Sequence, residues 1–170
     1  MQSPNSTHIL ILEDDETLRC ALSDLLEDEG YFVGAASQAE EALMLAENQA
    51  FDFMIFEIRM AGMDGLEAFQ RLRQRGFRFP SLAMTGFAGD DDPIRALKLG
   101  VGDYLSKPFQ PEELLESVAR LLARHRSRQE MERSQQELRS LTRWAGRCLT
   151  GESPFLDRLD ALAEASELMP

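Results

Sequence analysis

Five short apolar runs, each followed by a stretch of helical periodicity, constrain the fold of this chain most strongly. Continuous apolar runs of this length are typical of strands that are buried on both faces of a sheet. Regular alternation of such strands with helices indicates a parallel sheet covered by helices on both sides. We therefore predict an α/β fold with a five-stranded parallel sheet. The expected strands are His8–Leu12, a strand starting at Tyr31–Val33, Phe51–Phe56, Pro80–Met84 and Val101–Leu105.

The helical stretches between these runs carry start and stop signals. Ser37 with Glu40 is expected to form a capping box at the start of the second helix. Asp92 as N-cap and Pro93 in the first turn predict the start of the fourth helix. The other signals are apolar faces and glycine stops: Leu18, Leu22, Leu25 and Leu26 before Gly30; Leu66, Phe69 and Leu72 in the helix Gly65–Gln74 before Gly76; Gly100 after the fourth helix; and Pro111 opening the fifth.

Composition and charge exclude several classes of protein. No apolar run approaches the roughly 20 residues that span a bilayer, and the polar start lacks a signal-peptide pattern, so we expect no membrane contact and a cytoplasmic location. The net charge of −12 argues against nucleic acid as a direct partner. Cys20 and Cys148 fit no metal or disulfide pattern, and Cys20 is expected to be a small core residue.

Polar side chains with related chemistry follow four of the five expected strands. Glu13 and Asp14 come after the first strand, Glu57 ends the third, Thr85 ends the fourth, and Lys107 follows the fifth. The carboxyl ends of parallel strands meet at one edge of a sheet, where ligands gather. Carboxylate oxygens suit Mg²⁺, and an ammonium and a hydroxyl can hold phosphate oxygens. The sequence thus predicts a site for a divalent cation and a phosphoryl group.

Four segments in this order resemble the receiver domains of two-component response regulators. They are Ile9-Leu-Ile-Leu-Glu-Asp-Asp15, Phe56-Glu-Ile-Arg-Met-Ala-Gly-Met-Asp-Gly65, Met84-Thr-Gly86 and Asp103-Tyr-Leu-Ser-Lys-Pro-Phe109. The resemblance covers about residues 8–124. It implies a flavodoxin-like (βα)5 fold, a role in phosphorelay signal transduction, a sensor histidine kinase as partner and no enzymatic activity of its own.

The resemblance also implies a role for each residue that matches a family motif. Glu13 and Asp14 match the acidic pair that binds Mg²⁺, with Asp14 in direct contact and Glu13 acting through water. Thr85 and Tyr104 match the switch hydroxyl and the switch aromatic, which turns inward when the hydroxyl moves. Lys107 matches the phosphate-binding lysine, and its bond to Pro108 is expected to be cis. The set is completed by Arg59, whose backbone carbonyl is expected in the metal shell together with a Glu57 oxygen.

Glu57 departs from the family pattern, which has the phosphate-accepting aspartate at this position. The side chain is one methylene longer, so the attacking oxygen shifts by about an ångström, which reactions that depend on alignment tolerate poorly. One interpretation is that Glu57 acts as a permanent mimic of phosphoaspartate. Alternatively, the domain is a degenerate receiver that serves as a dimerisation or docking adaptor without phosphotransfer. Engineering of this position is a third reading, although Ala61, where the family usually has proline, favours natural drift.

Beyond the receiver, at 1–124, polar and arginine-rich sequence continues without Gly or Pro until Gly146. Met131, Leu138, Leu141 and Ala145 recur at coiled-coil spacing, which predicts a helical linker over 125–148 and a parallel homodimer through residues 112–149. A solitary helix is the alternative.

The last segment, 149–170, contains Gly-Glu-Ser-Pro before an apolar helical pattern. It resembles the start of the AAA+ domain of NtrC-type, sigma-54-dependent activators, which implies a transcription-activating ATPase effector acting in cis or in trans. A generic amphipathic helix is the alternative. The sequence contains no phosphate-binding G-x-x-x-x-G-K-[ST] loop, so the chain is either a piece of a larger activator or a receiver without its effector.

Overall fold

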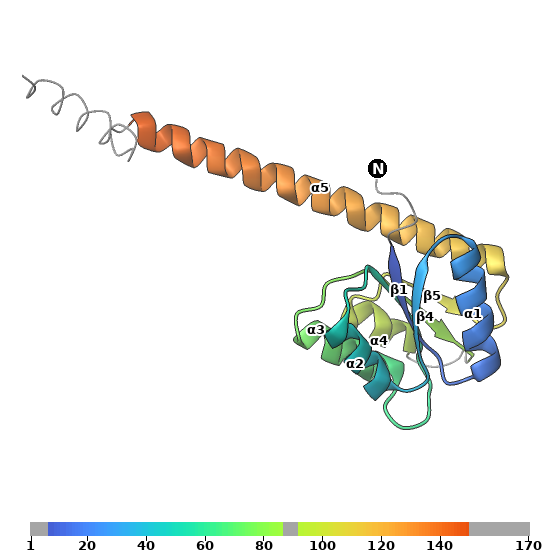
Figure 1. Cartoon of the computed structure of the whole chain (residues 1–170). Helices are drawn as coiled ribbons and strands as arrows, with labels where there is room; N and C mark the ends of the chain where they lie inside the picture. Colours follow the sequence, from blue (N-terminus) through green and yellow to red (C-terminus); the bar gives the residue numbers. More distant parts are fainter. Residues whose placement is uncertain (1–6, 87–91, 150–170) are drawn as a thin grey trace, which may run out of the picture. The chain divides into compact units, whose positions relative to one another are not determined.

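A five-stranded parallel sheet organises the protein in this computed structural model, which describes residues 7–86 and 92–149 (Figure 1). The strands lie in the order β2-β1-β3-β4-β5, and all neighbouring strands are parallel. This arrangement confirms the predicted fold class. The elements are β1 (His8–Leu12), α1 (Glu16–Asp28), β2 (Phe32–Ala36), α2 (Ala39–Asn48), β3 (Phe53–Glu57), α3 (Gly65–Gln74), β4 (Ser81–Thr85), α4 (Asp92–Leu99), β5 (Asp103–Ser106) and α5 (Pro111–Leu149).

The sheet divides the hydrophobic core into two layers. Along β1, Ile9 and Ile11 point to one face and Leu10 and Leu12 to the other, as the two-residue period of a strand requires. Helices α2, α3 and α4 supply buried residues to the layer of Leu10 and Leu12. Helix α1 and the first turns of α5 supply those to the layer of Ile9 and Ile11. Figure 1 shows α2, α3 and α4 on one side of the strands and α1 on the other.

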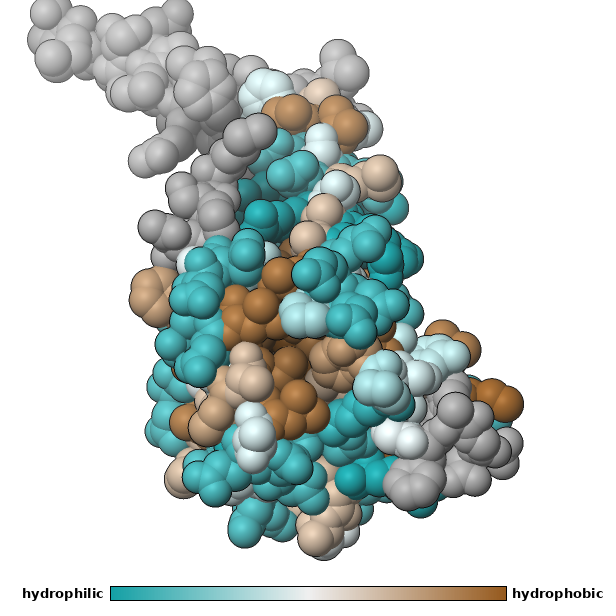
Figure 2. Space-filling view, turned by 90° about the vertical axis from the view of Figure 1, so that its right-hand side faces the viewer, coloured by the Kyte–Doolittle hydropathy of each residue, from teal (hydrophilic) through white to brown (hydrophobic). Residues whose placement is uncertain are grey.

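The layer under α1 and α5 leaves some apolar surface open. Seven hydrophobic residues pack against it while staying partly accessible. Figure 2, which views the protein from the side where α1 lies, shows apolar surface framed by hydrophilic residues. The seven residues are Leu18, Leu25, Tyr31, Val33, Leu105, Phe109 and Leu115.

Two helix starts are capped by aspartate, and one predicted cap is wrong. Asp15 and Asp64 accept hydrogen bonds from the backbone N–H groups three residues later, as N-caps do. The predicted capping box of Ser37 with Glu40 does not form. The N-cap of α2 is Gln38, and the Ser37 N–H and hydroxyl donate to Glu41 instead. Because α2 begins one residue later than a Ser37 cap requires, Glu41 takes the place expected for Glu40.

Two further predictions need correction. Cys20 is exposed on α1, whose inward face is taken by Leu22 and Leu26, and is not a core residue. The last strand begins at Asp103 rather than at Val101. Val101 is buried, but it lies in the turn before β5, where its N–H bonds to the carbonyl of Ala96 at the end of α4.

The chain divides into two compact units, Met1–His125 and Arg126–Pro170. Within the first unit, α5 buries Leu114, Val118, Leu121 and Leu122. Within the second, α5 continues to Leu149, and the large hydrophobic side chains Met131, Leu138, Leu141 and Trp144 are exposed. Residues 150–170, and with them most of the segment expected to resemble an AAA+ domain, lie outside the described residues. Over 7–86 and 92–149, no helix combines the length and apolar character needed to cross a membrane.

Candidate functional site

The carboxyl ends of the strands bring the predicted site residues to one edge of the sheet. Glu57 is the last residue of β3 and Thr85 the last of β4, while Glu13 and Lys107 directly follow β1 and β5. The parallel ladder continues into the loops, because the N–H of Glu13 bonds to the carbonyl of Ala36 and the N–H of Lys107 to that of Thr85, at 2.7 Å. Backbone hydrogen bonds between neighbouring strands therefore fix the positions of the Cα atoms from which these side chains project. The Lys107–Pro108 bond is cis, as predicted.

The ammonium of Lys107 lies between two buried carboxylates. Its Nζ is 2.8 Å from Oε2 of Glu13 and 2.5 Å from Oε2 of Glu57. The side chains of Glu13 and Glu57 are only 1% and 6% exposed, whereas that of Lys107 is 23% exposed. Burying charges at this depth requires paired partners, and the lysine supplies a partner to both carboxylates at once.

The second oxygen of each carboxylate is held by the backbone. Oε1 of Glu57 accepts a hydrogen bond from the N–H of Arg59 at 3.0 Å, and Oε1 of Glu13 accepts one from the N–H of Asp15 at 3.2 Å. All four carboxylate oxygens therefore have a donor. We call Glu13, Glu57 and Lys107 the charge triad.

Burial and ion pairing have opposite effects on the pKa of Glu13 and on the pKa of Lys107. Burial raises the pKa of Glu13 above its ordinary value of 4.5, against the opposing pull of Lys107, and repulsion from Glu57 adds to the rise. For Lys107, burial alone would lower the pKa. The hydrogen bonds and charges of Glu13 and Glu57 outweigh it and raise the pKa above 10.5. Lys107 is thus firmly protonated at neutral pH.

The predicted metal ligands are not assembled into a metal site. Asp14 is exposed, and its Oδ2 accepts a long hydrogen bond of 3.5 Å from the N–H of Ala61. Glu13 and Glu57 each direct an oxygen to Lys107. Among the described residues, no group of three Asp, Glu, His or Cys side chains is arranged to hold a metal ion. The donors have the right chemistry for Mg²⁺, but in this arrangement an ammonium already neutralises two of them, and the residues do not fit the metal.

The two predicted switch residues differ in burial. Thr85 is 1% exposed at the end of β4, whereas Tyr104 on β5 is 43% exposed, so its ring is turned outward. The backbone N–H of Tyr104 bonds to the Asp103 carboxylate at 2.9 Å. The inward position expected for a switched aromatic is therefore not the one observed.

The sequence analysis assigned no role at the site to two residues that shape it. Arg19, on α1, donates from Nη1 to the backbone carbonyls of Glu13 at 2.8 Å and Asp14 at 3.3 Å, and so braces the acidic loop. The sequence feature that could have indicated this role is the position of Arg19, about one helical turn after the acidic residues 13–16. Gly65, at the start of α3, lies so close to β3 that a Cβ atom there would be 1.9 Å from the carbonyl oxygen of Glu57.

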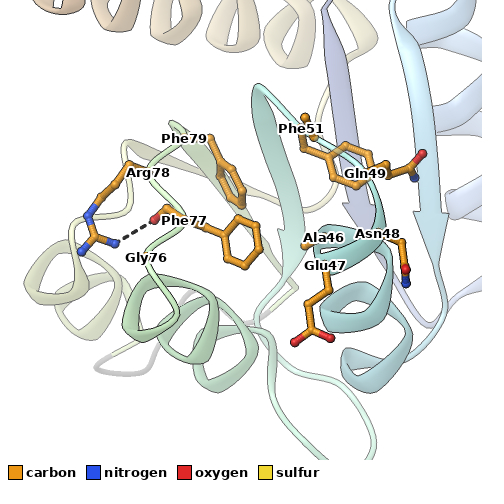
Figure 3. A pocket seen from close by; sticks show the side chains of 10 residues that line it. Ala46, Glu47, Asn48, Gln49, Phe51, Gly76, Phe77, Arg78 and Phe79 are labelled. Carbon is orange, nitrogen blue, oxygen red and sulfur yellow. Dashed lines mark hydrogen bonds between the residues drawn. The ribbon is translucent and has the colours of Figure 1, made fainter.

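A surface hollow of about 490 Å³ lies away from the charge triad, beside the residues that precede β3 and β4 (Figure 3). The rings of Phe51, Phe77 and Phe79 line it. Arg78 points away from the hollow and donates to the carbonyl of Phe77 at 2.9 Å. None of the residues that line the hollow belongs to the charge triad. The candidate functional site is therefore the charge triad at the carboxyl ends of the strands, and the hollow is not part of it.

Comparison with protein families identifies the domain. Residues 9–119 match the response regulator receiver domain. The chain is 40% identical over 112 residues to the response regulator protein FleR of Pseudomonas aeruginosa, a match that covers 66% of this chain and 24% of FleR. It is 37% identical over 116 residues to PhoP of Bacillus subtilis, the alkaline phosphatase synthesis transcriptional regulatory protein, covering 68% of this chain and 48% of PhoP. The chain thus spans at most about half of these two relatives.

The same match appears among solved structures. The CheY-like receiver domain protein of Methanospirillum hungatei superposes with a TM-score of 0.69 at 30% identity, covering 72% of this chain and 98% of that one. The match to the receiver family, over residues 9–119, includes the whole charge triad and all five strands apart from His8, the first residue of β1. The sheet order, the site at its carboxyl edge and these relatives agree, and the chain belongs to the family of response regulator receiver domains.

Proposed function

We propose that this chain is the receiver module of a two-component response regulator whose state is set by Glu57 instead of by phosphate transfer. The observation that carries the proposal is the placement of the Lys107 ammonium, 2.8 Å from Glu13 and 2.5 Å from Glu57. Response regulators of this family are phosphorylated by sensor histidine kinases, and their receivers bind Mg²⁺ at the phosphorylation site. In this chain, the two groups that phosphorylation would use, the carboxylate at position 57 and the ammonium of Lys107, are already paired with each other.

The chemistry of acyl-phosphate formation explains why Glu57 is a poor acceptor. A carboxylate oxygen must approach phosphorus in line with the leaving group, and the developing charge must be neutralised. In this site both oxygens of Glu57 are engaged, one with Lys107 and one with the N–H of Arg59. Attack requires breaking one of these contacts within a buried, charged environment. A constant negative charge at this position, held against Lys107, is the feature that makes Glu57 a mimic of a phosphorylated receiver.

The output is proposed from the relatives and from the remaining sequence. PhoP of B. subtilis is a transcriptional regulatory protein and FleR is a response regulator. We propose a transcription-activating output here too, with 1–124 as receiver, 125–148 as dimerising linker and 149–170 as the start of an AAA+ effector that acts in cis or in trans. A sensor histidine kinase is the proposed partner of the receiver surface.

A docking adaptor that passes no phosphate onward is the second candidate. It is favoured by Tyr104, whose ring is 43% exposed. An aromatic ring in this orientation offers apolar surface to a partner, whereas a receiver locked in its switched state would turn the ring inward. The two candidates share the charge triad and differ in whether Glu57 changes the position of Tyr104.

The test combines phosphorylation with the position of Tyr104. The full chain, Glu57→Asp and Glu57→Gln are incubated with Mg²⁺ and a small-molecule phosphodonor, and intact masses are measured. We expect a stoichiometric phosphoryl adduct on Glu57→Asp and none on the other two. A stoichiometric, Glu57-dependent adduct on the unmodified chain contradicts the proposal. NMR of Tyr104 then separates the candidates. A ring that moves between the unmodified chain and Glu57→Gln supports the mimic, and an unchanged ring supports the adaptor.

A further inference from the structure

We propose that the C-terminal end of α3 and the hollow beside it form a docking surface for an acidic segment of a partner protein, which places one large apolar side chain in the hollow. The inference goes beyond the proposed function, because this surface lies away from the charge triad. We call it the arginine–phenylalanine surface, and it consists of Arg73, Arg78, Phe51, Phe77 and Phe79.

The end of α3 concentrates positive charge in an acidic protein. Four of the chain's 18 Lys and Arg residues lie within residues 71–78, while the net charge of the chain is −12. Two of the four arginines form ion pairs with glutamates. Arg73 and Arg78 have no carboxylate partner in the part of the chain that the structure describes. This segment therefore keeps two positive charges in excess.

The guanidinium groups of Arg73 and Arg78 are held in place and lie close enough to repel each other. Arg78 donates from Nη1 to the carbonyls of Arg73 at 2.6 Å and Phe77 at 2.9 Å. The guanidinium of Arg73 lies 5.8 Å from the centroid of the Phe69 ring and donates no hydrogen bond to any described residue. Burial and the charge of Arg78 lower the pKa of Arg73 below its usual value. Carboxylates that bind both guanidinium groups would relieve this repulsion.

The hollow supplies an apolar site next to these charges. It has a volume of about 490 Å³ and is lined by the rings of Phe51, Phe77 and Phe79 (Figure 3). Phe77 and Phe79 form one side, with ring centroids 6.1 Å apart, and Phe51 lies over Gly34, where a Cβ atom would be 2.7 Å from its Cζ. The rings of Phe51 and Phe77 stay partly accessible. Aromatic pockets beside arginine are typical of the contacts that dominate binding at protein interfaces.

Charge decides which kind of partner fits. A basic or neutral segment would leave Arg73 and Arg78 without a partner once water is excluded, which costs free energy. Acidic side chains would pair with both. The acidic remainder of the protein does not prevent this, since exposed charges more than about 8 Å apart are largely screened at physiological ionic strength. The arginine–phenylalanine surface thus matches a segment in which acidic residues flank one large apolar residue.

Three pentapeptides test the surface on the full chain. The probe is Glu-Asp-Phe-Asp-Glu, blocked at both ends, and NMR of the isotope-labelled chain follows its binding. We expect saturable shifts at Phe51, Phe77 and Phe79, with a dissociation constant that rises with salt. Replacing the central phenylalanine by alanine should weaken binding at least about tenfold, because the anchor loses most of its apolar burial. Lys-Lys-Phe-Lys-Lys should also bind at least about tenfold more weakly, because it meets like charge.

A matched pair of substitutions tests the role of Arg73. Arg73→Met keeps an apolar stem beside Phe69 and removes the charge, so it should weaken binding of the probe about fivefold. Arg124→Met removes an exposed arginine of α5 and should change binding less than about twofold.

A second pair separates charge from structural damage. Glu47→Gln and Arg75→Gln both break the same ion pair. Glu47→Gln releases a guanidinium for the probe and should tighten binding about twofold, whereas Arg75→Gln removes that guanidinium and should weaken binding by a similar factor. Damage to the fold alone would move both variants in the same direction.

Several results would overturn the inference. They are absence of saturable binding, equal binding of the three peptides, equal effects of Arg73→Met and Arg124→Met, and changes of the same sign for Glu47→Gln and Arg75→Gln. Tighter binding of pentathymidylate than of the acidic peptide would also overturn it, since the surface would then suit nucleic acid. None of these measurements involves Glu57 or phosphoryl transfer, so their failure is distinguishable from failure of the proposed function.

Discussion

At the scale of single residues, the extra methylene of Glu57 brings its carboxylate into contact with the Lys107 ammonium. It carries the carboxylate out from β3 to within 2.5 Å of the Lys107 ammonium while its other oxygen stays bonded to the N–H of Arg59. Glu13 approaches the same ammonium from β1. Two buried negative charges are thus stabilised by one positive charge, and the site depends on Lys107 more than on either acid.

Replacing Lys107 by methionine tests this dependence. Lys107→Met leaves Glu13 and Glu57 buried without their cation, and the free energy of unfolding should fall by about 2–3 kcal/mol near pH 7, less than for a fully buried pair because Lys107 is partly in water. The pKa of Glu13 is already above 4.5, and losing Lys107 raises it further. Urea unfolding across a range of pH measures the effect.

The sign of the pH dependence follows from the raised pKa. A carboxyl group with a raised folded-state pKa favours the fold while it is protonated and loses that contribution as the pH rises through the folded-state value. The loss in free energy of unfolding caused by Lys107→Met should therefore be smallest near about pH 4 and grow toward about pH 8. Lys98→Met, which removes an exposed lysine, is the matched control and should cost little at any pH. A deficit that stays constant across this range contradicts the prediction.

Lys107 has its own signature at alkaline pH. Its raised pKa means that its contribution to stability is fully present below 10.5 and is lost as the pH rises through the higher folded-state value. Lys107 therefore contributes to the stability of the fold throughout the neutral range.

At the scale of elements, the contact between α3 and β3 positions Glu57. The N–H of Gly65 bonds to the carbonyl of Ile58 at 3.0 Å, and a Cβ atom at position 65 would overlap the carbonyl oxygen of Glu57. Helix α3 can start this close to the strand only because residue 65 has no side chain.

Gly65→Ala should therefore destabilise the fold by about 2–3 kcal/mol, since backbone atoms have to shift to admit the methyl group. The same shift moves the carboxylate of Glu57, so NMR signals around Lys107 should change as well. Gly86→Ala is the control, because nothing lies within 4 Å of a Cβ atom there. Urea unfolding of the three proteins gives the comparison. Equal stability of Gly65→Ala and Gly86→Ala contradicts the tight contact.

Elements were predictable from the sequence where one physical signal dominates. The apolar runs located all five strands, with starts displaced by up to two residues. Burial on both faces accounts for the continuous hydrophobic sequence of β1, β3 and β4, whereas the edge strands β2 and β5 are only partly buried. Local polar signals were weaker guides. Ser37 pairs with Glu41 rather than Glu40, since the start of α2 is set by packing of Ala39, Ala42 and Leu43 on the sheet.

Contacts across the site were predictable only in part. The positions of the strand ends in the sequence predicted which residues lie together at the site, because the carboxyl ends of parallel strands meet at one edge of the sheet. They did not tell that Glu13, 94 residues away in sequence, would bind Lys107 while Asp14 stays exposed. That choice depends on which carboxylate points inward from the loop after β1, and Arg19 helps to fix this loop through two backbone carbonyls.

At the scale of the whole molecule, the two units differ in what stabilises them. The buried residues of both core layers lie between Ile9 and Leu122, inside the unit Met1–His125. In the second unit, α5 exposes Met131, Leu138, Leu141 and Trp144. The first unit should thus fold by itself, whereas the helical structure of the second should depend on a partner.

Truncation separates these contributions. A chain that ends at His125 keeps the whole core and should unfold cooperatively, with a free energy within about 1 kcal/mol of the full chain at concentrations too low for association. A chain that ends at Arg120 loses Leu121 and Leu122, which are 4% and 6% exposed, and should be less stable by at least about 3 kcal/mol. The melting temperature of the full chain should rise with protein concentration, because association stabilises the folded state by mass action, while that of the chain ending at His125 should not. Two results would contradict the idea that the first unit folds by itself while the second depends on a partner. One is a melting temperature of the full chain that is independent of concentration, and the other is the loss of cooperative unfolding on removal of residues 126–170.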